Sequence, residues 1–238
     1  MRRYKTNLAV IEQNNATGGV SYWQGADNQS LADRNGVSLA DYIHAMYGFV
    51  RQAKARHVLL IGCGGGTLAT MLHRAGVRVT MADNDPSSFA VARTYFALPQ
   101  AVACHVADGI RFLKTHDRRY DAIVLDAYNG GAVPKPFLRP AFFALARARL
   151  KRGGIFLANL TARNDADRTP DRIARVMQGA FGDTVKLHDA DGYFDRNVVA
   201  VAGATRNLRQ PRLLMKPERR AKSIAKNLRE LDFRPLRD

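Results

Sequence analysis

Glycine is concentrated directly after an apolar run at residues 57–67, HVLLIGCGGGT, where four of the five residues that follow HVLLI are glycine. Gly62, Gly64 and Gly66 form a GxGxG pattern. Such a turn after a strand lets a cofactor lie against bare backbone, and the helix that follows offers free N–H groups. The GK[ST] sequence of a Walker phosphate loop is absent, so we do not interpret this turn as a Walker loop.

Three aspartates end the next three strand-like runs, which cover 77–83, 101–108 and 120–126. We predict that Asp83 accepts hydrogen bonds from the ribose hydroxyls, that Asp108 with Gly109 meets the adenine, and that Asp126 ends the fourth strand at the same edge. Each acid could instead be a helix cap or a turn residue. A nicotinamide-dependent dehydrogenase would use the same features, although nothing later in the chain resembles a hydride-transfer domain.

Strand-like runs separated by helical patterns predict a parallel sheet with helices on both faces. Two last runs, 184–188 and 197–203, are joined by a loop too short for a helical crossover, so they form an antiparallel pair. This order is typical of the α/β fold of class I methyltransferases, which is Rossmann-like. We predict a small β-hairpin unit at 1–36, the catalytic domain at 37–204 and a basic helical tail at 205–238.

The chain has 238 residues and a formal charge of +16, with net +7 in residues 206–238. No run is long enough for a membrane span or a signal peptide, so we expect a cytoplasmic protein. Two cysteines and six histidines show no metal-binding spacing, and we predict no metal. In the tail, Ile224 and Leu228 share an apolar helical face and Pro217 suits the first turn. We favour a docked helix over a nucleic-acid-binding arm.

Several segments in this order resemble the spermidine synthase (polyamine aminopropyltransferase) family: VLLIGCGGGTLATMLHR, VTMADNDPSSFAVARTYF, VADGIRFLK, YDAIVLDAY and LKRGGIFLANL. The resemblance covers about residues 57–160 well and 184–203 loosely. It implies decarboxylated S-adenosylmethionine or S-adenosylmethionine itself as co-substrate, Asp126 as the catalytic acid, a small amine as the other substrate, and a homodimer.

The sequence also departs from this family. The family's aspartate inside the glycine loop is replaced by Cys63, Gly64 and Gly65, and the second aspartate of the loop after the fourth strand is Asn129. The family's YHEM stretch keeps only its histidine, His44, and its methionine, although Tyr42 could stand in for the tyrosine. By resemblance we assign His44, Tyr128 and Asn129 to the substrate.

Three hypotheses follow. The first is aminopropyl transfer from decarboxylated S-adenosylmethionine to an amine. The second is methyl transfer from S-adenosylmethionine, which the missing loop aspartate permits because a bound carboxylate would meet no fixed negative charge there. The third is a non-catalytic relative whose basic tail binds nucleic acid or another anionic partner.

Overall fold

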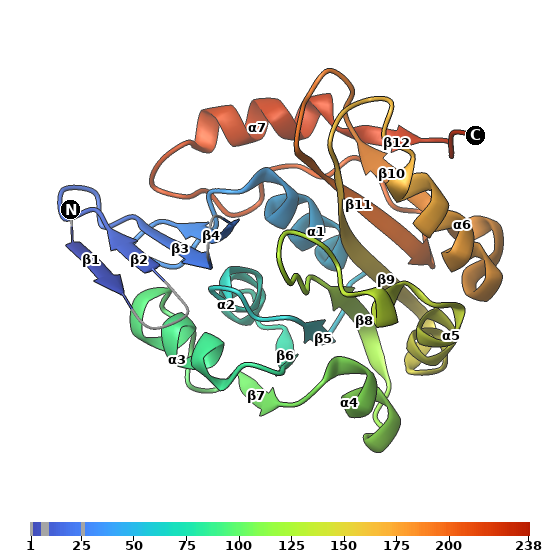
Figure 1. Cartoon of the computed structure of the whole chain (residues 1–238), viewed down its shortest axis with the longest axis horizontal. Coiled ribbons are helices and arrows are strands. Elements are labelled where there is room, and N and C mark those ends of the chain that lie inside the picture. The colour runs from blue at the N-terminus through green and yellow to red at the C-terminus, as the bar shows by residue number, and fades with distance from the viewer. Residues whose placement is uncertain (1, 6–9, 25–26) are drawn as a thin grey trace.

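The computed structural model describes residues 2–5, 10–24 and 27–238, which form two sheets flanked by helices (Figure 1). The N-terminal sheet is antiparallel, and its strands follow the chain order: β1 (Arg2–Lys5), β2 (Val10–Gln13), β3 (Val20–Gln24) and β4 (Asp27–Ala32). We predicted a hairpin here, and the described residues form four strands instead. The buried side chains of Ile11, Val20 and Tyr22 pack this sheet against Val91 and Phe96 of the main body.

The main sheet has the order β12-β10-β11-β9-β8-β5-β6-β7. Five strands are parallel, namely β5 (His57–Ile61), β6 (Arg78–Asp83), β7 (Ala103–Val106), β8 (Tyr120–Leu125) and β9 (Leu150–Ala162). The remaining three run antiparallel to their neighbours: β10 (Lys186–Asp189), β11 (Arg196–Gly203) and β12 (Asp232–Arg234). The predicted α/β fold of the class I methyltransferase type is confirmed.

Helices cover both faces of this sheet because its central strands are apolar on both sides. On β5, Val58 and Leu60 belong to the buried cluster under α1, α2 and α3, whereas Leu59 and Ile61 belong to the cluster under α4, α5 and α6. Figure 1 shows where these helices lie around the sheet. The helices are α1 (Asp41–Gln52), α2 (Thr67–Arg74), α3 (Pro86–Tyr95), α4 (Gly109–Thr115), α5 (Pro140–Ala148), α6 (Thr169–Phe181) and α7 (Ala221–Glu230), with short 3-10 turns η1 (Lys135–Leu138) and η2 (Gly182–Thr184).

The strand order reverses between β5 and β8. From β5 the chain adds β6 and β7 on one side and then returns to place β8 on the other. A crevice forms at such a reversal because the connections after the two central strands leave in opposite directions. The glycine loop follows β5 and Asp126 follows β8, so the fold brings both predicted features to this crevice.

The basic tail packs on the body, as predicted for a docked helix. Ile224 and Leu228 of α7 are buried against α1, and β12 extends the main sheet. Pro217 does not begin the helix, because Arg220 adopts a left-handed conformation with φ of 59° and the helix begins at Ala221. The segment before α7 contacts a different part of the body, since the Glu218 backbone N–H donates to Asp33.

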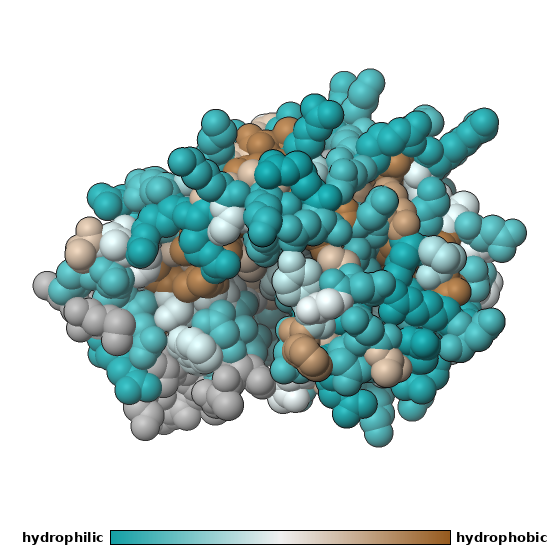
Figure 2. All heavy atoms as spheres, turned by 90° about the horizontal axis from the view of Figure 1, so that it is seen from above, coloured by the Kyte–Doolittle hydropathy of each residue, from teal (hydrophilic) through white to brown (hydrophobic). Residues whose placement is uncertain are grey.

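The face that carries α7 is mostly hydrophilic (Figure 2). The exposed positions of this helix include Lys222, Lys226 and Arg229. Within the described residues, no helix combines the length and the apolar character that a membrane span requires.

Shortening the buried side chain of Leu228 tests whether α7 is docked on the body. Leu228→Ala should lower the free energy of unfolding by about 2–4 kcal/mol, because it leaves a cavity under the helix. Lys222→Ala on the exposed face should change it by less than about 0.5 kcal/mol. Urea denaturation followed by circular dichroism measures both, and equal stability of the two variants would contradict the docking.

Candidate active site

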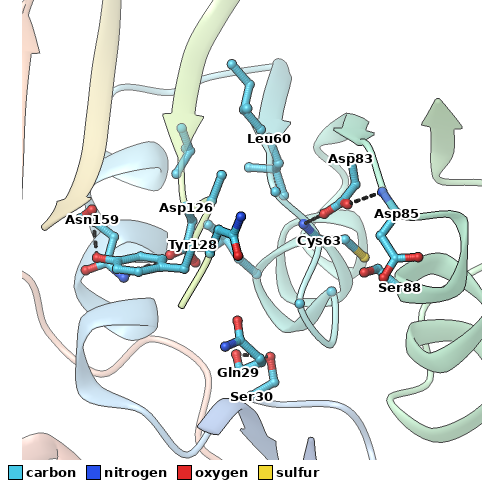
Figure 3. Close-up of a pocket in the computed structure, with 18 of the residues that line it drawn as sticks. Gln29, Ser30, Leu60, Cys63, Asp83, Asp85, Ser88, Asp126, Tyr128 and Asn159 are labelled. Carbon is cyan, nitrogen blue, oxygen red and sulfur yellow. Dashed lines mark hydrogen bonds between the residues drawn. The ribbon is translucent and has the colours of Figure 1, made fainter. Parts of the chain in front are cut away.

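A cavity of about 830 Å³ lies at the reversal of strand order. Its walls are the glycine loop, the ends of β6 and β8, the N-terminus of α4 and one edge of the N-terminal sheet. Figure 3 shows Asp83 and Asp126 on opposite sides of Cys63, with Gln29 and Ser30 of β4 on the facing wall. Ala107, Asp108 and Gly109 line the cavity as well. The structure therefore brings the three predicted acids to one cavity.

The glycine loop is pressed against the end of β8. Gly62 has a φ of 98°, and a Cβ atom there would lie 2.2 Å from the carbonyl oxygen of Asp126. A side chain is therefore excluded at Gly62 by both conformation and space. The Asp126 backbone N–H donates to the Ile61 carbonyl at 2.9 Å. The loop and the carboxylate are thus positioned by one close backbone contact.

Protein groups already bind two N–H groups of the loop. The Cys63 N–H donates to Asp83 Oδ2 at 2.7 Å, and the Gly65 N–H donates to Ser30 Oγ at 2.7 Å. Sequence reasoning missed Ser30, because β4 is far from the loop in the chain. Thr67 and Leu68, at the N-terminus of α2, line the cavity. We predicted free N–H groups at the N-terminus of the helix that follows, whereas these two N–H groups of the turn before it have partners in the protein.

Asp83 accepts a second backbone hydrogen bond, from the Asp85 N–H to Oδ1 at 2.8 Å. Burial raises the pKa of the Asp83 carboxyl, and the two backbone donors act in the opposite direction. Each oxygen keeps a second lone pair, so the carboxylate can still accept hydrogen bonds from two ligand hydroxyls. This geometry fits the vicinal hydroxyls of a ribose.

Asp108 and Gly109 have structural roles besides lining the cavity. Asp108 caps α4, with its Oδ1 accepting the Arg111 N–H at 2.9 Å. A Cβ atom at Gly109 would lie 2.4 Å from Cγ2 of Ile61, so glycine lets α4 pack closely on β5. The assignment of these residues to an adenine stays a prediction.

Asp126 is held by a chain of amides that sequence reasoning missed. Asn159 Nδ2 donates to Asp126 Oδ1 at 2.8 Å, and Asn159 Oδ1 accepts from Asn197 Nδ2 at 3.0 Å. The Tyr128 hydroxyl donates to the Asn159 carbonyl at 3.0 Å. Asn159 is only 1% exposed. Its one signal in the sequence is a polar residue inside the apolar run GIFLANL.

The carboxyl group of Asp126 changes its protonation state close to neutral pH. Burial raises its pKa to about 6, although the hydrogen bond from Asn159 favours the charged form. Nearby, the pKa of Tyr42 is raised well above its usual value, first by burial and then by the charge of Asp126. Asp126 is therefore a carboxylate above about pH 6 and a carboxylic acid below it, which suits a group that exchanges protons.

Of the residues assigned to the substrate, Tyr128 and Asn129 line the cavity. Asn129 also forms a tight turn with Ala132 through its backbone N–H. His44 lies outside the cavity lining and is 1% exposed, with its Nε2 bonded to the Ser38 carbonyl at 2.8 Å. The helix α1 turns this ring into the core and places Tyr42 at the cavity instead. We therefore do not retain His44 as a substrate contact.

Comparison with known proteins agrees with this architecture. The family described as "Methyltransferase domain" matches residues 58–154. A polyamine aminopropyltransferase of Neisseria meningitidis serogroup A is 29% identical over 146 residues, which cover 58% of this chain and 56% of the relative. An eEF1A lysine and N-terminal methyltransferase homolog of Drosophila melanogaster is 31% identical over 127 residues, covering 48% of this chain and 19% of the relative.

The crystal structure of a probable spermidine synthase from Corynebacterium glutamicum superposes with a TM-score of 0.77 at 19% identity, over 99% of this chain and 90% of that one. The match includes the N-terminal sheet. The matched segments span about half, or less, of the length of the curated relatives.

The sheet order and the cavity at its reversal define a class I methyltransferase-like fold. Within that class, residues 58–154 match the methyltransferase domain family, and the chain is similar to polyamine aminopropyltransferases in sequence and to a probable spermidine synthase in fold. The described residues contain no cluster of three or more histidine, cysteine, aspartate or glutamate side chains arranged to hold a metal ion.

Neutralising the partly buried Asp126 should stabilise the fold at alkaline pH. Because the folded state raises the Asp126 pKa, the protonated form is favoured by folding, and this stabilisation is lost as the pH rises through about 6. At pH 8 the free energy of unfolding of Asp126→Asn should therefore be about 1–2 kcal/mol higher than that of the native chain. Near pH 4 the two proteins should have similar free energies of unfolding.

Thermal denaturation across this pH range measures the difference. Asp183→Asn, at an exposed position of η2, serves as the control and should change the free energy of unfolding by less than about 0.5 kcal/mol. A native chain more stable than Asp126→Asn at pH 8 would contradict the burial of a charge at this site.

Removal of the amide donor should raise the pKa of Asp126. Asn159→Ala deletes the hydrogen bond that favours the carboxylate, so the titration midpoint of the Asp126 carboxyl should move above pH 6. Asn197→Ala should produce a smaller change in the same direction, because it only releases the orientation of Asn159. Carboxyl ¹³C NMR titration measures both midpoints. A midpoint unchanged by Asn159→Ala would show that the hydrogen bond does not act on the acid.

Proposed function

We propose that the protein transfers an aminopropyl group from decarboxylated S-adenosylmethionine to a small amine. The observation that carries the proposal is Asp126, a carboxylate with a pKa of about 6 at the end of β8, facing a cavity sized for a nucleoside and a small acceptor. The similarity to polyamine aminopropyltransferases supports the same reading.

The cavity residues suit a nucleoside donor. Asp83 has lone pairs available for two ribose hydroxyls, and Asp108 lies at the end of the next strand, where an adenine amino group could donate to it. Gly62 and Gly64 carry no side chains, so at these two positions the backbone of the loop is open to a ligand between these acids and Asp126. When bound, the sulfonium donor supplies a carbon that a nucleophile can attack.

Asp126 would prepare the nucleophile. An amine is protonated at neutral pH and must lose a proton before its lone pair can attack, and a nearby carboxylate both attracts the ammonium and accepts that proton. In the transfer a new N–C bond forms and the C–S bond breaks. The bonding pair of the C–S bond goes to sulfur, which becomes a neutral thioether. The amides of Asn159 and Asn197 keep the carboxylate oriented toward the cavity.

Methyl transfer from S-adenosylmethionine is a second candidate. The described loop has no acid at Cys63, Gly64 or Gly65, so the carboxylate of intact S-adenosylmethionine would meet no fixed negative charge there. Curated methyltransferases are also similar in sequence to this chain over about half of its length. The chemistry at Asp126 would be the same, because both reactions are displacements by an amine at a carbon bonded to sulfonium.

Mass spectrometry of the products separates these candidates. Incubation with decarboxylated S-adenosylmethionine and 1,4-diaminobutane should yield methylthioadenosine and an amine heavier by one aminopropyl group. Asp126→Asn should lower the turnover by about 10²–10⁴-fold. S-adenosylmethionine carrying a labelled methyl group should leave the amine unlabelled. Label transfer to the amine, without product from the decarboxylated donor, would replace aminopropyl transfer by methyl transfer.

A further inference from the structure

The C-terminal tail carries its positive charge on the outside of the molecule. Every lysine and arginine in residues 206–229 is exposed, namely Arg206, Arg209, Arg212, Lys216, Arg219, Arg220, Lys222, Lys226 and Arg229. The same residues contain one acid, Glu218. We call these nine cations the basic surface. Their charge is not balanced by acids of the same segment.

Helix α7 separates its cations from its apolar side chains. Ile224 and Leu228 are buried, whereas Lys222, Lys226 and Arg229 are exposed. A helix turns by about 100° per residue, so the three cations lie within about 60° of one another and roughly opposite the buried pair. With a rise of about 1.5 Å per residue, they form a stripe about 10 Å long. The stripe faces solvent because the apolar side of the helix packs on α1.

The segment before α7 lies beside this helix. The side chain of Gln210 donates from Nε2 to the carbonyls of Arg229 at 2.8 Å and Leu231 at 2.7 Å. The backbone of Arg209 is held in turn by the side chain of Gln52 in α1, through two hydrogen bonds of 2.7 and 3.0 Å. Both passes of the tail therefore lie over α1, and the cations of both contribute to one layer on the outside of the body.

The two glutamates of the tail are already engaged. Glu218 binds Arg34, which lies outside the tail, at 2.9 Å. Glu230 pairs with Lys226 at 3.5 Å and accepts a hydrogen bond from the Tyr193 hydroxyl. Exposed ion pairs of this kind contribute little free energy. A polyanion can therefore replace Glu230 as the partner of Lys226 at small cost.

The chemistry of the basic surface favours nucleic acid as its partner. Protein interfaces have an apolar core, and helices bound to a membrane surface insert apolar side chains. Among the large apolar side chains of residues 206–231, all of which the structure describes, only Leu214 is exposed, at 56%. Nucleic-acid interfaces are more polar and more positive. These residues also contain no aromatic side chain for stacking on unpaired bases, so the phosphates of a duplex are the better match.

We propose that the basic surface binds the phosphate backbone of double-stranded nucleic acid without reading its sequence. Cations that contact phosphates release the counterions condensed on the duplex, and this release drives the binding. The cavity that holds Asp126 is a separate site, since its described lining contains no lysine or arginine. The binding does not depend on the proposed transferase function. Helix α7 can be docked and bind nucleic acid at once, because its buried and cationic sides are opposite each other.

Fluorescence anisotropy of labelled short DNA duplexes, titrated with the full chain at a series of KCl concentrations, tests the assignment. The native chain should bind two unrelated sequences equally, with an affinity that falls steeply with salt. Combined replacement of the stripe, Lys222→Gln, Lys226→Gln and Arg229→Gln, should reduce the slope of log K against log salt by about 2–3, because each lost phosphate contact removes about 0.9.

A matched control removes three charges from the other face of the sheet. Arg111→Gln, Arg147→Gln and Arg172→Gln replace exposed arginines of α4, α5 and α6, and this variant should keep the native slope. An equal loss of slope in both variants would show attraction by net charge alone and would overturn the assignment.

Two further outcomes would also overturn it: no duplex binding by the native chain at low salt, or binding to vesicles of anionic lipid but not to duplexes. Turnover of the proposed transfer should be the same in both variants and the native chain, because none of the six replaced residues lines the cavity. Duplex binding by a chain that transfers no aminopropyl group would leave this assignment intact and count against the proposed function alone.

Discussion

The active site depends on one close contact, between the backbone of the glycine loop and the end of β8. Because Gly62 has no side chain, the loop passes against the Asp126 carbonyl, and the acid stands at the floor of the cavity. Burial there disfavours the charge, and the amide of Asn159 favours it. The balance leaves a pKa of about 6, at which the group can both attract a cation and take its proton.

Elements distant in the chain complete this site. Ser30 of the N-terminal sheet binds the loop from one side and Asp83 of β6 binds it from the other, so the loop is fixed before any ligand arrives. The C-terminal helix α7 contributes Asn227 and Glu230 to a neighbouring cavity, which shares Tyr42, Asp195 and Asn197 with this one.

The strands of the main sheet and their acids could be predicted from the sequence because apolar runs and the residues that end them are local signals. The glycine turn, Asp83, Asp108 and Asp126 were found in this way, and all four reach one cavity. The contacts of Ser30 and Asn159 could not be predicted, since they join residues more than 30 positions apart. His44 was assigned to the substrate by resemblance, but it is two positions after Tyr42 on α1, which places the two side chains about 200° apart around the helix and turns His44 into the core.

Three short strands, β1, β4 and β12, were not predicted from the sequence, for a related reason. Short edge strands such as β12 have few residues and weak alternation, and they are defined by the neighbour with which they pair. The start of α7 was misjudged because contacts of Glu218 with the body outweigh the preference of Pro217 for a first helical turn. In both cases tertiary contacts decided the local structure.

The most direct test of the account is the proton balance of donor binding at pH 6, where Asp126 is about half ionised. Calorimetric titration of decarboxylated S-adenosylmethionine in buffers of different ionisation enthalpy measures the protons released. A sulfonium beside Asp126 should lower its pKa, so the native chain should release a fraction of a proton and Asp126→Asn should release none. Binding without proton release in the native chain, or equal release by both proteins, would contradict the claim that this carboxylate faces the reacting centre.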